Sequence, residues 1–230
     1  MFHSDLPTMV VFDVDDTLYL ERDYVASGFE HAGQVARQRW GVRGLTGAAW
    51  GLFESGCRGD VFDRALTALG VTPTPERIAV LVRAYRTHRP RITLLPDVRP
   101  VLEELWGRGV AIGVLTDGPP ESQAAKVLAL RLRRYARHTV LTDRYGPGYG
   151  KPHPRGFQEL ADGCGTGRIA YVADNPHKDF IAPRQLGWVT VRVRRPGGQH
   201  VAVPHGDDVD HVLTDFSGLT EALADRRVPA

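Results

Sequence analysis

Short apolar runs that end in an acidic or hydroxyl side chain recur along this chain, and they constrain its fold more than any other feature. The runs are Met9–Phe12, Val110–Leu115 and Ile169–Ala173. The residues that follow them are Asp13, Thr116 and Asp174. Short apolar runs bounded by polar residues are typical of strands that are buried on both faces, as in a parallel sheet.

Segments with helical spacing of apolar residues lie between these runs, for example at Val98–Arg108 and Glu121–Leu132. A further strand is expected at Val189–Val193. Strands that alternate with helices indicate a parallel sheet with helices on both of its faces. We therefore predict an α/β fold whose core is a doubly wound, Rossmann-like parallel sheet.

The segment between the first two apolar runs shows only helical patterns. Its apolar residues recur at helical spacing in three stretches, which are Phe29–Trp40, Val61–Leu69 and Ile78–Tyr85. We predict an inserted helical unit, residues 21–91, and a core made of residues 1–20 and 92–230.

Composition excludes several classes of protein. The net charge of +2 over 230 residues gives no reason to expect a nucleic-acid partner, and no apolar stretch approaches the length of a membrane span. The two cysteines form no CxxC pair, so a reducing cytoplasm is the expected location.

Lysine is rare in this chain. Of the 29 basic residues, 26 are arginine, and the lysines are Lys126, Lys151 and Lys178. Where a lysine does occur, its chemistry is therefore of interest.

The carboxyl ends of the expected strands form the predicted site, because ligands of open α/β sheets bind there. Asp13 and Asp15 are two residues apart at the first strand end, and adjacent carboxylates repel each other unless they share a cation or a proton. Mg²⁺ prefers oxygen ligands, and phosphate oxygens commonly complete its coordination shell. Asp174 is a natural third protein ligand. Lys151 supplies a positive charge and Thr116 a hydroxyl for a phosphoryl group.

Four motifs resemble those of the haloacid dehalogenase (HAD) superfamily, and they occur in that superfamily's order. Asp13-Val-Asp15-Asp-Thr17 is similar to its DxDxT motif, and Leu115-Thr116 to its second motif. Lys151-Pro152 resembles the third, and Asp174-Asn-Pro-His-Lys-Asp179 the acidic fourth.

The resemblance implies a role for each motif. Asp13 is expected to be the nucleophile that forms an aspartyl-phosphate, and Asp15 the general acid and then the base. Mg²⁺ is expected to be held by Asp13, the Asp15 backbone carbonyl and Asp174, with Asp179 acting nearby or through water. Thr116 and Lys151 are expected to bind the phosphoryl oxygens.

The position of the helical unit resembles that of a cap which closes over the site and selects the substrate. Candidate substrate-binding residues besides Thr116 and Lys151 are Asp117 at the second strand end and Arg22 and Arg58 in the cap.

The implied function is Mg²⁺-dependent hydrolysis of a phosphate monoester of a small metabolite, either a sugar phosphate or a nucleoside monophosphate. Asp15 favours phosphoryl transfer over halide displacement, because the dehalogenases of this superfamily lack an acid at that position. A phosphomutase of the same superfamily and a non-catalytic binding protein on the same scaffold remain alternatives. A monomer or weak homodimer is expected.

Overall fold

The computed structural model describes residues 6–165 and 167–225. These residues form two compact units. The first contains the chain up to Glu21 and from Thr93 onward, and the second contains Arg22–Ile92. Each unit is described by itself below.

The first unit is built on a six-stranded sheet in which every pair of neighbouring strands is parallel. The strands are β1 (Met9–Phe12), β2 (Ala111–Thr116), β3 (Ala136–Leu141), β4 (Ile169–Ala173), β5 (Val189–Val193) and β6 (His211–Leu213). Their order is β3-β2-β1-β4-β5-β6, so the chain moves outward from β1 in one direction and then, from β4, in the other. The predicted doubly wound sheet is confirmed.

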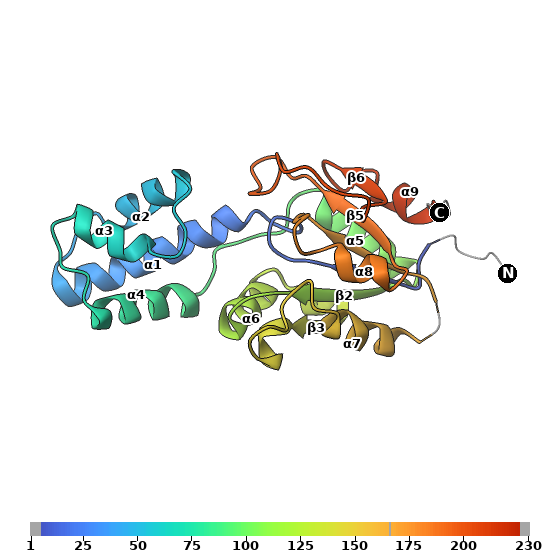
Figure 1. Cartoon of the computed structure of the whole chain (residues 1–230), viewed down its shortest axis with the longest axis horizontal. Coiled ribbons are helices and arrows are strands. Elements are labelled where there is room, and N and C mark those ends of the chain that lie inside the picture. The colour runs from blue at the N-terminus through green and yellow to red at the C-terminus, as the bar shows by residue number, and fades with distance from the viewer. Residues whose placement is uncertain (1–5, 166, 226–230) are drawn as a thin grey trace. The chain divides into compact units, whose positions relative to one another are not determined.

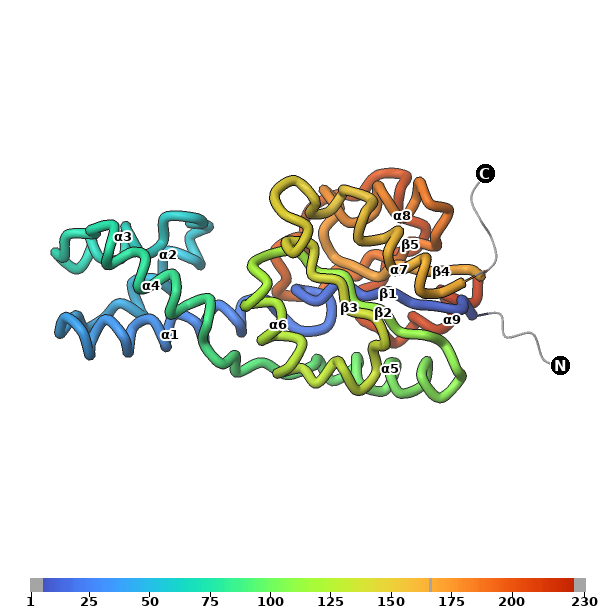
Figure 2. Tube along the Cα trace, turned by 90° about the horizontal axis from the view of Figure 1, so that it is seen from below, coloured from blue at the N-terminus to red at the C-terminus, as the bar shows by residue number. Residues whose placement is uncertain are grey.

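Helices cover both faces of this sheet, with α5 and α9 on one face and α7 and α8 on the other (Figure 2). The elements are α5 (Val98–Gly107), α6 (Pro120–Ala129), α7 (Arg155–Cys164), α8 (Ile181–Gln185), α9 (Leu219–Ala224) and the short 3-10 helices η1 (Leu132–Arg134) and η2 (Thr142–Tyr145). Alternate residues of β1 face opposite sides: Val11 packs with Phe157 of α7, whereas Phe12 lies 5.7 Å from Phe216, between ring centroids.

This strand order places the ends of β1 and β4 side by side at the point where the winding direction reverses. Phe12 of β1 pairs with Val114 of β2 and with Val172 of β4, so these three strands end at nearly the same level. In doubly wound sheets this switch point is where ligands bind. The residues that follow the three strands therefore meet at one edge of the sheet.

The second unit consists of four helices, shown in Figure 1. They are α1 (Glu21–Trp40, whose first residue belongs to the first unit), α2 (Leu45–Glu54), α3 (Val61–Ala68) and α4 (Pro75–Thr87). A buried cluster that includes Phe29, Phe53, Phe62 and Leu81 joins them. The start of α4 is set locally, because Pro75 fits the first helical turn and the Thr74 hydroxyl accepts a hydrogen bond from the Arg77 amide.

Some elements were not predicted from the sequence. Helix α2 was not predicted, although its buried residues Leu45, Ala49 and Phe53 recur every fourth position. The three-residue strand β6 was not predicted either. Among the described residues, no helix is both long and apolar enough to cross a membrane.

Candidate active site

Three buried aspartates lie together at the carboxyl ends of β1 and β4. Asp13 follows β1, Asp174 follows β4, and Asp179 ends the loop between β4 and α8. One carboxylate oxygen from each lies within 4.8 Å of the others. We call Asp13, Asp174 and Asp179 the acid cluster. The sequence predicted that these residues meet, and the structure brings them together.

The Lys151 ammonium is inserted between two members of the acid cluster. Its Nζ lies 2.6 Å from an oxygen of Asp13 and 2.7 Å from an oxygen of Asp179. It also donates a hydrogen bond of 3.1 Å to the Tyr171 hydroxyl, which stands on β4. Lys151 is 7% exposed. These three short contacts of the ammonium fix the position of its positive charge relative to Asp13.

One lysine does not balance three buried carboxylates. Burial raises the pKa of Asp13 to about 7, although Lys151 opposes this shift. Burial, followed by repulsion from Asp13 and Asp179, raises the pKa of Asp174 to about 9. With all three aspartates ionised, the cluster and Lys151 together carry a charge of −2. The donor set consists of carboxylate oxygens, which are the ligands that a hard divalent cation prefers. The residues present therefore fit such an ion.

The Asp15 side chain turns toward helix α6 and meets a second buried lysine. Lys126 Nζ lies 2.7 Å from each of the two carboxylate oxygens of Asp15. The Tyr19 hydroxyl also donates to Asp15. Burial alone would raise the pKa of Asp15, but the charge and hydrogen bonds of Lys126, with those of Tyr19 and Gln123, hold it below its ordinary value.

Gln123 joins Asp15 to the end of β2. The buried Thr116 hydroxyl donates to Gln123 Oε1 at 3.0 Å. Gln123 Nε2 in turn donates to Asp15 Oδ2 at 3.3 Å. The second-motif threonine and the second aspartate of the first motif are thus connected through one side chain of α6.

Asp117 contacts protein groups on three other segments. Its carboxylate is paired with Lys178 at 2.7 Å and accepts hydrogen bonds from the Thr142 hydroxyl at 2.8 Å and the Lys151 backbone amide at 3.1 Å. These contacts connect the loops that carry the second, third and fourth motifs.

Two further side chains stabilise the loops that carry the aspartates by hydrogen-bonding to backbone groups. Asp16 has a φ of 50°, and its carboxylate accepts hydrogen bonds of 2.8 Å from the backbone amides of Glu21 and Gln199. On β5, the fully buried Arg192 donates from Nε to the Asp174 carbonyl at 3.1 Å. These bonds account for backbone polar groups that the turns would otherwise leave unpaired.

The two arginines predicted as substrate-binding residues, Arg22 and Arg58, lie in the second unit and contact other groups of that unit. Arg22 pairs with Glu54 at 2.9 Å. Arg58 donates to the carbonyls of Phe53 and Cys57 at 2.8 Å, and its guanidinium lies 4.0 Å from the centre of the Phe53 ring.

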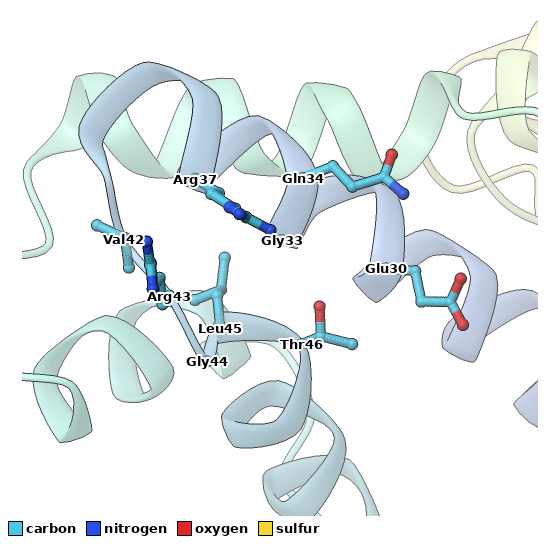
Figure 3. Close-up of a pocket in the computed structure, with 9 residues that line it drawn as sticks. All are labelled: Glu30, Gly33, Gln34, Arg37, Val42, Arg43, Gly44, Leu45 and Thr46. Atoms are coloured by element: carbon cyan, nitrogen blue, oxygen red, sulfur yellow. The ribbon is translucent and has the colours of Figure 1, made fainter.

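A cavity of about 450 Å³ opens in the second unit between α1 and the start of α2 (Figure 3). Its lining includes Gln34, Arg37, Arg43 and Thr46. None of the residues that line it was among the candidate site residues.

Sequence reasoning assigned no site role to several described side chains that contact the site aspartates or Thr116. They include Tyr19, Gln123, Lys126, Thr142, Tyr171 and Lys178. The scarcity of lysine was the one sequence signal that could have pointed to Lys126 and Lys178. All three lysines of this arginine-rich chain pair with aspartates here.

Fold and site together define a class of protein: an α/β enzyme with a doubly wound parallel sheet that presents carboxylates and a buried lysine at its strand ends. The sequence matches the haloacid dehalogenase-like hydrolases over residues 7–187, and the chain belongs to that family. The resemblance of the four motifs is thereby confirmed.

Named relatives agree with this assignment. The chain is 33% identical over 153 residues to a glyceraldehyde 3-phosphate phosphatase of Methanopyrus kandleri, a match that covers 64% of each chain. It is 35% identical over 161 residues to a phosphoserine phosphatase of Thermus thermophilus, covering 68% of this chain and 61% of that protein. The chain thus spans less than two thirds of the length of these two relatives. A crystal structure of a HAD phosphatase from Thermococcus onnurineus has a TM-score of 0.61 and 22% identity, covering 96% of this chain and 99% of that one, which shows the fold.

Proposed function

We propose that this protein is a Mg²⁺-dependent phosphatase that hydrolyses the phosphate monoester of a small metabolite through a phosphorylated Asp13. The observation that carries the proposal is the acid cluster with Lys151 inserted between Asp13 and Asp179. A carboxylate nucleophile, a cation beside it and an oxygen-rich metal site are the parts that phosphoryl transfer requires.

In the first step an Asp13 carboxylate oxygen attacks phosphorus, and the bond from phosphorus to the ester oxygen breaks. The departing oxygen needs a proton, and we propose that Asp15 donates it after leaving the contacts with Lys126 that hold Asp15 ionised in this structure and taking up a proton. Lys151 stays beside Asp13 and orients the attacking carboxylate, while the Thr116 hydroxyl donates a hydrogen bond to a phosphoryl oxygen. The products of this step are the alcohol and an acyl-phosphate on Asp13.

In the second step a water molecule attacks the same phosphorus atom. Asp15, now a carboxylate, takes a proton from this water, and the bond between Asp13 and phosphorus breaks. Inorganic phosphate leaves, Asp13 is again a carboxylate, and Asp15 again holds the proton that it donates in the next turnover.

Mg²⁺ would be held by Asp13, Asp174 and the backbone carbonyl of Asp15, with Asp179 beside them. When bound, it would supply positive charge that stabilises the negative charge building up on the transferring group. The −2 charge of the cluster with Lys151 matches one divalent ion.

A small sugar phosphate is the substrate class that we favour, because the first of the two relatives is named for glyceraldehyde 3-phosphate. The second is named for phosphoserine, which is a small phosphate monoester but not a sugar phosphate. We propose that the helical unit, residues 21–91, acts as the cap that selects this substrate. Arg22–Ile92 contains eleven arginines and six acidic residues, a formal charge of +5, which suits an anionic substrate.

Phosphate release from a panel of esters tests the function. The panel holds glyceraldehyde 3-phosphate, phosphoserine, phosphoglycolate, a nucleoside monophosphate and p-nitrophenyl phosphate, each with Mg²⁺ and with EDTA. We expect Mg²⁺-dependent release from a triose phosphate well above release from p-nitrophenyl phosphate. Conversion of a sugar phosphate to its isomer without phosphate release would identify a phosphomutase instead, and binding without turnover a non-catalytic protein.

Metal binding is expected to tighten as the pH rises. Because the pKa values of Asp13 and Asp174 are raised to about 7 and about 9 in the metal-free protein, both groups retain protons at about pH 6 that Mg²⁺ must displace. Calorimetric titration with MgCl₂ should show an affinity about tenfold or more higher at about pH 8 than at about pH 6. Asp174→Asn should lose most of the binding, whereas the exposed Asp162→Asn should not change it. Equal affinity at both pH values would count against this metal site.

A further inference from the structure

The backbone of Lys151 lies in a connection that is rich in glycine. We call residues 146–154, between η2 and α7, the Lys151 loop. It contains three glycines, and two of them, Gly146 and Gly148, have φ values of 95° and 86°. Glycine restricts the backbone less than any other residue. The position of Lys151 therefore depends on the contacts that this loop makes with the rest of the first unit.

Asp117, at the end of β2, provides such a contact. Its Oδ1 accepts a hydrogen bond of 3.1 Å from the Lys151 backbone amide and one of 2.8 Å from the Thr142 hydroxyl of η2. Its Oδ2 lies 2.7 Å from the Nζ of Lys178, in the loop between β4 and α8. One carboxylate thus joins the segments that follow β2 and β3 to the loops that carry the third and fourth motifs.

These contacts differ from those expected of a substrate-binding residue, which is the role that the sequence predicted for Asp117. Both of its carboxylate oxygens already accept hydrogen bonds from protein donors. Burial would raise the pKa of Asp117, but the charges of Lys151 and Lys178 hold it below its ordinary value. Asp117 is therefore an anion, and direct contact with a negatively charged phosphoryl group would be repulsive.

The far end of the Lys151 side chain contacts a group that changes during the proposed reaction. Its Nζ lies 2.6 Å from Asp13, which receives the phosphoryl group in the first step and loses it in the second. The ion pair with Asp179 at 2.7 Å holds the tip of the lysine during this change. Asp117 takes no part in bond making, and its hydrogen bond to the amide holds the base of the same residue.

We propose that Asp117 is a positioning residue that fixes the Lys151 loop, so that Lys151 Nζ stays between Asp13 and Asp179 throughout the reaction. This inference rests on the proposed phosphatase function. It gives Asp117 a role in the rate of the chemical step and not in binding of the substrate. A shift of about 1 Å in a group beside the reacting atoms lowers a rate by as much as about 100-fold.

Steady-state kinetics with the ester that wild type hydrolyses fastest tests this role. We expect Asp117→Ala to lower kcat by about 10–100-fold and to change KM by less than about threefold. In Asp117→Asn the side-chain oxygen can still accept the Lys151 amide, so this variant should recover at least about fivefold of the lost kcat. Asp162→Ala, at an exposed position of α7, is the matched control and should behave as wild type.

Acetylation of the lysines separates positioning from a general loss of structure. Lys126, Lys151 and Lys178 are the lysines of the whole chain, so peptide mapping after treatment with an N-hydroxysuccinimide ester assigns each modified amine. Lys126 and Lys151 are both buried, at 3% and 7% exposure, but Lys126 lies outside the loop. In metal-free Asp117→Ala, acetylation of Lys151 should be about tenfold faster than in wild type and that of Lys126 within about twofold, because the opening is local.

Thr142→Val is the second variant, and it decides the question if Asp117→Ala does not fold. It removes the hydroxyl that donates to Asp117 but leaves this carboxylate and Lys178 in place. We expect kcat to fall by about threefold to tenfold, the scale of one hydrogen bond. Acetylation should again be faster at Lys151 and unchanged at Lys126.

Three results with Asp117→Ala would overturn the positioning role and leave the phosphatase function in place. They are equal acceleration of acetylation at Lys126 and Lys151, an unchanged kcat, and a KM raised about tenfold with Lys151 still protected, which would identify a direct contact with the substrate. A wild-type protein that releases phosphate from no ester of the panel would contradict the proposed function itself, and the inference with it.

Discussion

Replacing Asp13 by asparagine is expected to lower kcat by about 10⁴-fold or more, the scale seen when an enzyme loses its nucleophile. An amide oxygen is a far weaker nucleophile than a carboxylate, and the acyl-phosphate cannot form on it. Asparagine has nearly the same shape, and Lys151 keeps its ion pair with Asp179 at 2.7 Å. The activity should therefore disappear without loss of the fold.

Stability separates this result from unfolding. Asp13→Asn removes one of three mutually repelling carboxylates, and the raised pKa of Asp13 shows that burial and its acidic neighbours disfavour its charge. The melting temperature of the metal-free variant should be equal to that of wild type or higher. Asp162→Asn, at an exposed position of α7, should retain full activity. A loss of activity smaller than about tenfold in Asp13→Asn would remove Asp13 from the role of nucleophile.

Replacing Lys151 by methionine is expected to have the largest effect on stability together with a large effect on rate. Lys151 is the cation that lies between Asp13 and Asp179, and removing one partner of a buried ion pair leaves uncompensated charge at a cost of about 3–5 kcal/mol. The kcat should fall about 10²–10³-fold, because a fixed positive charge beside the reacting group is lost.

Chemical denaturation of the metal-free variants measures the stability effect. The matched control is Arg64→Met, which breaks an exposed ion pair with Asp60 and should change the free energy of unfolding by less than about 1 kcal/mol. Mg²⁺ should restore part of the stability that Lys151→Met loses. A Lys151→Met protein as stable and active as wild type would show that Lys151 plays no part in the site.

The sequence predicted the sheet and the acid cluster because both follow from one rule. Apolar runs identify the strands, parallel strands end at a common edge, and Asp13 and Asp174 follow two such runs. The central position of β1 between β2 and β4 then makes these residues neighbours. Lys151 lies in a loop, where no strand pattern places it, and the scarcity of lysine and the motif resemblance pointed to it.

The α6 contacts were beyond the reach of pattern reasoning. Gln123 and Lys126 read as ordinary polar residues of an amphipathic helix, and nothing in their spacing shows that this polar face is buried against Asp15. The scarcity of lysine was the one usable signal. For α2, the glycines at positions 47 and 51 weakened the helical signal, although Leu45, Ala49 and Phe53 are its buried face.

Trapping the covalent intermediate tests whether the phosphoryl group passes through Asp13. The enzyme would be mixed with Mg²⁺ and substrate labelled with ³²P, stopped in acid within milliseconds, digested and mapped. We expect the wild-type protein, and not Asp13→Asn, to carry a label on the peptide that contains Asp13, and we expect hydroxylamine to remove this label. Release of labelled phosphate in the first turnover with no label on that peptide, or with label on another residue, would show that Asp13 is not the nucleophile.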